Sequence, residues 1–175
     1  MSKRSRLSGK KRSTWGGKIL PALCNIAGTL IIVGVILILI PTVVPKLLGY
    51  EIYNITSGSM APEIPIGSVV IVNPVEPSEI LENDIIAYER GNSVVVHRAV
   101  SNHTFAGEFV TKGDANEEED FIAVPYSDYR GLVIRHFPYL GGWLAMNTTR
   151  AGKLTLMAYL ACGCLLNILA GKMRG

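Results

Sequence analysis

Two long uncharged apolar runs near the ends of the chain constrain its folding more than any other feature. The first run extends from Ile19 to Pro45, a stretch of 27 residues without a charge. A helix that crosses a bilayer needs about 20 apolar residues, whereas the apolar part of a cleavable leader has about 7–15. Pro21 suits an early helical turn, and Pro41 and Pro45 suit the end of a helix. We therefore predict an uncleaved signal anchor over residues 19–45.

The second run, Leu154 to Gly171, contains 18 uncharged residues, which is near the lower limit for a membrane span. Two glycines and an asparagine inside the run weaken the signal. We predict a second transmembrane helix over residues 154–171. A hydrophobic hairpin or a helix that lies in the membrane interface is the alternative.

The charges are distributed unevenly along the chain. Residues 1–18 carry seven basic residues and no acid, all fourteen acids lie between Glu51 and Asp128, and two basic residues return within 172–175. The positive-inside rule predicts that both ends are cytoplasmic and that the middle lies outside. A nucleic-acid-binding or lipid-binding arm is the alternative for residues 1–18. Because an apolar run follows directly, we expect no nucleic-acid partner.

The middle of the chain, residues 46–150, is predicted to be a mostly β soluble domain tethered by a transmembrane helix at each end. Short β-branched runs bounded by Gly, Pro and Asn are typical of strands. Five such runs occur, at residues 68–72, 84–88, 93–100, 108–111 and 131–137. No segment of ten or more residues between Glu51 and Arg150 shows the period of a helix.

A serine-containing turn follows the first apolar run, in the sequence Ser57-Gly58-Ser59-Met60-Ala61-Pro62, and its Ser59 lies fifteen residues beyond Val44. The intervening chain keeps Ser59 within roughly 50 Å of the bilayer, since an extended residue spans at most 3.3–3.6 Å. A serine nucleophile needs a base and donors for the developing oxyanion. The Ser57 hydroxyl and the Ser59 N–H are candidate donors. An ordinary Ser/Gly turn is the alternative.

One histidine, His97, lies inside an apolar β-branched run. Strand alternation places Val95, His97 and Ala99 on one face. A histidine suits the role of a general base near neutral pH, and a hydrogen-bonded core residue is the alternative. The other histidines, His103 and His136, have no comparable surroundings.

An acidic loop offers carboxylates that could orient the imidazole of a Ser/His/Asp arrangement. Asp114 and Asp120 are both candidates, whereas residues 117–119 are more simply read as a solvated acidic surface. No Cys/His cluster has the spacing of a metal site, and no Gly-rich loop could hold a phosphate. We therefore expect neither a metal nor a cofactor.

These segments, taken in order, resemble the type I signal peptidases. Residues 57–62 are similar to the S-G-S-M-x-P box of that family, whose second serine is the nucleophile, and residues 83–88 to its G-D-I-V-x-F box. Residues 96–100 resemble the segment that carries the base. Histidine at that place marks the endoplasmic-reticulum and archaeal branch, which some Gram-positive bacteria share. Residues 112–120 resemble the K-G-D-N-N-x-x-D-D loop of that branch.

The resemblance covers Tyr50 to Gly142 and ends on a strand and a P-Y-x-G turn. It implies that Ser59 is the nucleophile, His97 the base and Asp120 the partner of the histidine, with Asp114 as an auxiliary. It further implies an enzyme that removes N-terminal signal peptides from exported preproteins at the outer surface of the membrane.

The resemblance also implies how the substrate and the partners are arranged. The preprotein would bind extended, as an added strand, and shallow pockets would select small side chains one and three positions before the cut. We expect Met60 and Pro62 to contact it. The expected partners are secretory preproteins and the lipid bilayer, with the membrane translocation machinery as a further candidate. Two spans and basic tails favour a multi-pass protein of the plasma membrane over the endoplasmic reticulum.

Two other functions stay open. In the first, Ser59 is the nucleophile but Lys112 is the base, as in serine–lysine peptidases. In the second, the chain is not an enzyme, and its β domain binds exported proteins at the membrane.

Overall fold

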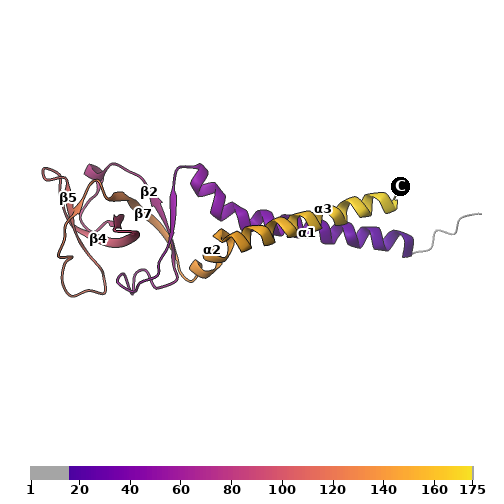
Figure 1. Cartoon of the computed structure of the whole chain (residues 1–175), viewed down its shortest axis with the longest axis horizontal. Coiled ribbons are helices and arrows are strands. Elements are labelled where there is room, and N and C mark those ends of the chain that lie inside the picture. The colour runs from indigo at the N-terminus through magenta and orange to yellow at the C-terminus, as the bar shows by residue number, and fades with distance from the viewer. Residues whose placement is uncertain (1–15, 175) are drawn as a thin grey trace, which may run out of the picture. The chain divides into compact units, whose positions relative to one another are not determined.

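The structure is a computed structural model that describes residues 16–174, and it divides into two compact units (Figure 1). The helical unit contains the residues up to Ile36 and those from Thr155 onward, and the β unit extends from Leu37 to Leu154. Most of the basic tail predicted for residues 1–18, and Gly175 of the tail predicted for residues 172–175, lie outside the described residues.

Two long helices contain the two apolar runs. Helix α1 extends over Gly16–Leu47 and helix α3 over Arg150–Arg174. Both are long and apolar enough to cross a membrane. Many of their large apolar side chains are exposed, which is expected of helices whose surroundings are lipid rather than protein.

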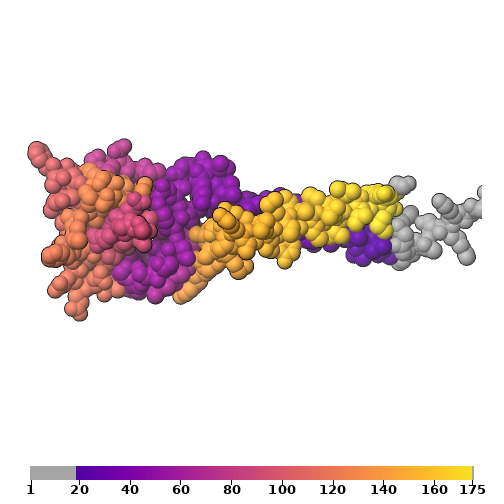
Figure 2. Space-filling model, viewed as in Figure 1, coloured from indigo at the N-terminus to yellow at the C-terminus, as the bar shows by residue number. Residues whose placement is uncertain are grey.

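Helices α1 and α3 contact each other in the helical unit at two glycines, one on each helix. A Cβ atom added to Gly28 of α1 would lie 2.7 Å from the carbonyl oxygen of Gly163 in α3, and one added to Gly163 would lie 2.9 Å from the carbonyl oxygen of Gly28. The backbones approach this closely because neither residue has a side chain. The side chains of α3 (yellow in Figure 2) accordingly lie against α1 (indigo) in this unit.

The β unit is built on one seven-stranded sheet in which every neighbouring pair is antiparallel, in the order β1-β2-β7-β3-β4-β5-β6. The strands are β1 (Glu51–Asn54), β2 (Val69–Asn73), β3 (Ile85–Arg90), β4 (Ser93–His103), β5 (Glu108–Lys112), β6 (Val124–Pro125) and β7 (Tyr129–Phe137). A short 3₁₀ helix, η1 (Pro77–Glu79), and helix α2 (Gly141–Thr148) complete the unit.

This architecture confirms the predicted class, a mostly β domain with an apolar helix at each end. All five predicted strands are present, as β2, β3, β4, β5 and β7. Strands β1 and β6 and helix α2 were not predicted. They have four, two and eight residues, and segments this short carry little periodic signal.

The sheet buries side chains on both of its faces. Neighbouring residues of a strand point to opposite faces, and the adjacent residues Ile86 and Ala87 of β3 belong to two different core clusters. The first cluster contains Ile55, Met60, Ile64, Val70, Val72, Ala87 and Val96. The second contains Ile80, Ile86, Tyr88, Ala99, Phe109 and Val124.

Candidate active site

The loop from Ile55 to Ser68, between β1 and β2, holds Ser59 in place. Its ends are joined by a hydrogen bond of 2.8 Å from the Ile55 N–H to the Ser68 carbonyl oxygen. Inside the loop, Met60 and Ile64 are 1% and 0% exposed and pack in the first core cluster. Because Met60 follows Ser59 directly, its burial fixes the backbone of Ser59 against the sheet.

Ser59 lies close to a second hydroxyl and to the loop that follows β5. Its Oγ is 3.3 Å from the Oγ of Ser57, and its carbonyl oxygen accepts a hydrogen bond of 2.8 Å from the Ala115 N–H. A Cβ atom added to Gly113 would lie 2.6 Å from that same carbonyl oxygen. Within residues 16–174 the Ser59 N–H has no hydrogen-bond acceptor, so it is available to bind a ligand oxygen.

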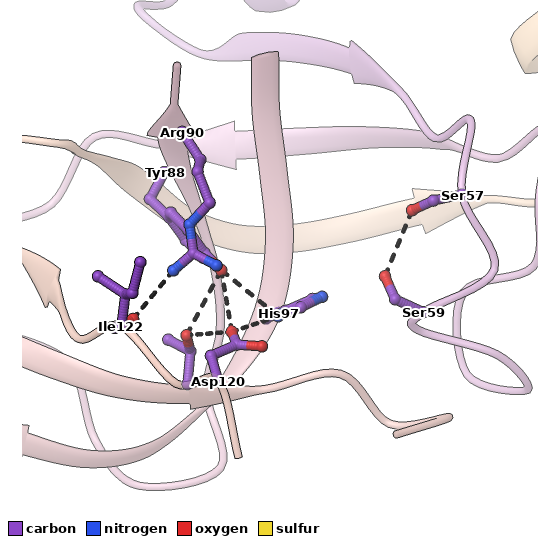
Figure 3. Close-up of polar contacts among 8 residues, drawn as sticks. Ser57, Ser59, Tyr88, Arg90, His97, Asp120 and Ile122 are labelled. Carbon is purple, nitrogen blue, oxygen red and sulfur yellow. Dashed lines mark hydrogen bonds and ion pairs between the residues drawn. The ribbon is translucent and has the colours of Figure 1, made fainter. Parts of the chain in front are cut away.

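His97 lies in the middle of β4, opposite Ile86 of β3. Its side chain is 8% exposed, and its Nδ1 atom lies 2.6 Å from Oδ2 of Asp120. Figure 3 shows the ring extending away from Asp120 toward the side on which Ser57 and Ser59 lie. No hydrogen bond joins Ser59 to His97 in the described part of the chain. In enzymes without substrate, the hydrogen bond between a nucleophile and its base is often long.

Asp120 is the centre of a buried hydrogen-bond network (Figure 3). Its Oδ2 atom accepts hydrogen bonds from His97, from the Thr111 hydroxyl at 2.6 Å and from the Tyr88 hydroxyl at 3.1 Å. Its backbone N–H donates to the Thr111 carbonyl oxygen at 2.8 Å. Three strands and the loop after β5 thus meet at one carboxylate.

The network determines the protonation of its members. Burial by itself raises the pKa of Asp120, but the hydrogen bonds from Thr111 and His97, the charge of His97 and the Tyr88 hydroxyl together hold that pKa below its usual range. Burial raises the pKa of Tyr88 to about 12, so the phenol keeps its proton and can donate it. An ionised carboxylate only accepts hydrogen bonds. The His97 proton therefore lies on Nδ1, and Nε2 is free to accept.

The other candidate carboxylate, Asp114, faces Arg98 instead of His97. Its Oδ1 and Oδ2 atoms accept from Nε and Nη2 of Arg98 at 2.8 and 2.6 Å. This hydrogen bonding raises the pKa of Arg98. Arg98 also donates from Nη1 to the Asn83 carbonyl oxygen at 2.7 Å. Through Arg98, Asp114 therefore links the loop after β5 to strand β4 and to the turn before β3.

Lys112, the alternative base, lies beside Arg98 in the β4–β5 pairing. It borders a pocket of about 290 Å³. The other residues that line this pocket are Glu82, Asn83, Arg98, Ala99, Val100, Gly113 and Asp114.

The structure places the two predicted substrate contacts differently. Met60 packs in the core, whereas Pro62 is exposed on the same loop. Tyr88 and Thr111 were not identified from the sequence. A tyrosine in an apolar strand was a visible signal for the first, but a threonine in a strand is too common to indicate a role.

No family model matches the chain. The chain is similar to Signal peptidase I W of Bacillus subtilis (strain 168), with 36% identity over 89 residues that make up 48% of this chain and 45% of the relative. The chain thus spans about half the length of the curated relative it matches. Two apolar helices accompany this similarity and indicate a membrane-anchored protein. The similarity supports a relationship to the type I signal peptidases.

Proposed function

We propose that this chain is a membrane-bound serine endopeptidase that removes N-terminal signal peptides from exported preproteins. The observation that carries the proposal is the 2.6 Å contact between His97 and Asp120, which leaves Nε2 of the ring directed to the side of Ser59. The similarity to Signal peptidase I W supports the substrate class. Because a histidine stands at the place of the base, we further propose that the chain belongs to the serine–histidine branch of the family.

The reaction proceeds through an acyl-enzyme. The Ser59 hydroxyl attacks the scissile carbonyl carbon while its proton passes to Nε2 of His97. The imidazolium then gives this proton to the leaving amine, and the C–N bond breaks. In the second half, water attacks the ester carbonyl carbon and loses a proton to His97, the C–O bond to Ser59 breaks, and His97 returns the proton to the Ser59 oxygen. Asp120 keeps the ring oriented and stabilises the imidazolium in both halves.

The oxyanion is bound by two groups of the Ile55–Ser68 loop. The free N–H of Ser59 is one donor, and the Ser57 hydroxyl, which lies 3.3 Å from the nucleophile, is the other. Donors that are in place before the reaction stabilise the developing charge without reorganisation. The burial of Met60 keeps this loop in place.

The substrate enters as an extended segment beside the site and uses its main-chain hydrogen bonds, with Pro62 exposed for contact. Residues 46–150 act at the outer surface of the plasma membrane, and the chain crosses that membrane at residues 19–45 and 154–171. The basic ends are cytoplasmic. Secretory preproteins emerge from the translocation machinery, which makes that machinery a partner in the same proposal.

Cleavage of preproteins by the purified full chain in detergent tests this function. We expect Ser59→Ala and His97→Ala to reduce kcat/KM about 10³-fold or more. We expect Lys112→Ala, at the end of β5, to retain activity within about 10-fold, because the proposed base is His97. Matched controls are Ser93→Ala, at an exposed serine, and His103→Ala, at a histidine that is 52% exposed.

The outcomes separate the alternatives. Full activity of His97→Ala together with loss of activity in Lys112→Ala would establish the serine–lysine mechanism. Cleavage that persists in Ser59→Ala would overturn the catalytic proposal. Specific binding of a panel of preproteins, with no new N-terminus found by sequencing of the products, would favour the non-enzymatic β domain.

A further inference from the structure

One oxygen atom of Asp120 accepts hydrogen bonds from side chains of three neighbouring strands. Tyr88 comes from β3, His97 from β4 and Thr111 from β5, and all three approach Oδ2. The two hydroxyls lie 3.1 and 2.6 Å from Oδ2. The mechanism proposed above uses His97 and Asp120 but assigns no role to either hydroxyl.

The segment around Asp120 has little packing of its own. Residues 117–119 before it are exposed, and Phe121 after it is 102% exposed. Two hydrogen bonds hold the segment in place. The Asp120 N–H donates to the Thr111 carbonyl oxygen, and Nη2 of Arg90 donates to the Ile122 carbonyl oxygen at 2.9 Å. The direction of the carboxylate therefore depends on the groups that hydrogen-bond to it.

We propose that Tyr88 and Thr111 are positioning residues, which hold Asp120 so that the His97 ring keeps its proton on Nδ1 and leaves Nε2 free for Ser59. This inference rests on the proposed function. It adds two residues that do not touch the substrate and that act through Asp120.

The distances indicate that the hydroxyls of Thr111 and Tyr88 both donate to Asp120. Thr111 has a single proton, and its Oγ1 is 2.6 Å from Asp120 but 3.4 Å from the Tyr88 hydroxyl, so it donates to Asp120. The Tyr88 hydroxyl is 3.1 Å from Asp120 and 3.4 Å from Nδ1 of His97. While Nδ1 carries a proton, Tyr88 cannot donate to it and donates to Asp120.

Loss of this arrangement favours the inactive tautomer of the His97 ring. If Asp120 takes up a proton, it becomes a donor, and Nδ1 of His97 can then serve as an acceptor. The ring proton moves to Nε2 in that state. A protonated Nε2 cannot take the proton of Ser59, so this tautomer is inactive.

Few titratable or charged groups face Asp120. His97 faces it from β4 and Tyr88 faces it from β3, and the Arg90 guanidinium packs over the Tyr88 ring at 5.3 Å from its centre. Without either hydroxyl the buried carboxylate has fewer donors for its charge, so it is protonated at a higher pH. The fraction of enzyme with a protonated Asp120, and with it the inactive tautomer, is then larger at each pH on the acid side of the activity profile.

Two isosteric variants in the full chain, Tyr88→Phe and Thr111→Val, test the inference. We expect each to lower kcat about 10-fold with little change in KM, and to move the acid limb of kcat/KM to higher pH. Thr111→Ser, which keeps the hydroxyl, restores both. Tyr126→Phe is the matched control, because the Tyr126 hydroxyl donates to Asn102 outside this network. Coincident pH profiles of wild type and both variants would overturn the inference.

A second readout does not require cleavage. The ¹⁵N resonances of the His97 ring report which nitrogen carries the proton, and we expect the Nδ1–H form in the wild type and a larger Nε2–H fraction in both variants. If the wild type cuts no preprotein but the variants shift the tautomer, the proposed function fails while the positioning role stands. If the wild type cleaves and neither variant changes the tautomer, the positioning role is wrong.

Discussion

The carbonyl oxygen of Ser59 accepts a 2.8 Å hydrogen bond from the N–H of Ala115. This bond joins the loop that carries the predicted nucleophile to the loop that follows β5. The second loop also carries Asp120, whose carboxylate holds His97. One segment of the chain therefore contacts the backbone of the proposed nucleophile through Ala115 and the proposed base through Asp120, and a disturbance in it acts on both.

The close approach of these two loops requires a glycine at residue 113. A Cβ atom there would lie 2.6 Å from the Ser59 carbonyl oxygen, a backbone atom that can move only with its loop. We expect Gly113→Ala to lower kcat about 10-fold or more, since small displacements of catalytic groups are costly. Gly142→Ala, where an added Cβ meets nothing within 4 Å, is the control. Unchanged kinetics of Gly113→Ala would show that the loops are not coupled.

The two candidate carboxylates should behave differently when each becomes an amide. Asp120→Asn removes the negative partner of Nδ1 and favours the wrong tautomer, so we expect a loss of about 10³–10⁴-fold in kcat. Asp114→Asn weakens a partly exposed ion pair with Arg98. It should cost about 1 kcal/mol of stability and little activity.

Steady-state kinetics and thermal unfolding of both variants, measured side by side, check this prediction. Equal losses of kcat in the two variants, at equal unfolding temperatures, would contradict the assignment of Asp120 as the partner of His97.

The lowered pKa of Asp120 predicts how the β unit responds to acid. Because the folded pKa lies below the unfolded value, the ionised carboxylate contributes stability that is fully present above the unfolded value, about 3.9. This stability is lost as pH falls through the folded pKa. We expect Asp120→Asn, which cannot titrate, to lose less stability between pH 5 and about 2.

Hydrogen exchange of the β-strand amides in the full chain, as a function of pH, measures this response. Glu117→Gln, at an exposed acid of the same loop, is the control and should follow the wild type. Parallel pH dependence of the wild type and Asp120→Asn would show that this carboxylate does not contribute.

The glycine contact between the apolar helices predicts a stability effect in the helical unit. A Cβ on Gly28 would lie 2.7 Å from the Gly163 carbonyl oxygen, so Gly28→Leu must separate α1 from α3. We expect a loss of about 1–3 kcal/mol, seen as a lower unfolding temperature in detergent. Gly34→Leu, on the same helix with nothing within 4 Å of an added Cβ, should leave this temperature unchanged. Equal temperatures for both variants would contradict the contact.

Much of the fold could be predicted because its signals are local. A run of 27 uncharged residues indicates a helix by length and composition alone, and runs such as the one in β4 indicate strands by their β-branched residues. The order of the strands in the sheet, in contrast, could not be predicted from local signals. Strand β7 pairs with both β2 and β3, although it follows them by many residues, and no local pattern encodes that pairing.

Local patterns indicated which reactive groups the chain contains: a serine in a turn after an apolar run, one histidine in an apolar strand and an acidic loop. Which of the two acids contacts the histidine depends on the tertiary fold. His97 and Asp120 are 23 residues apart, and the return of the chain through β5 brings them together, whereas Asp114 on the same loop meets Arg98. Such contacts depend on strand register and on the path of a loop without periodicity, and both arise from packing between segments distant in the chain.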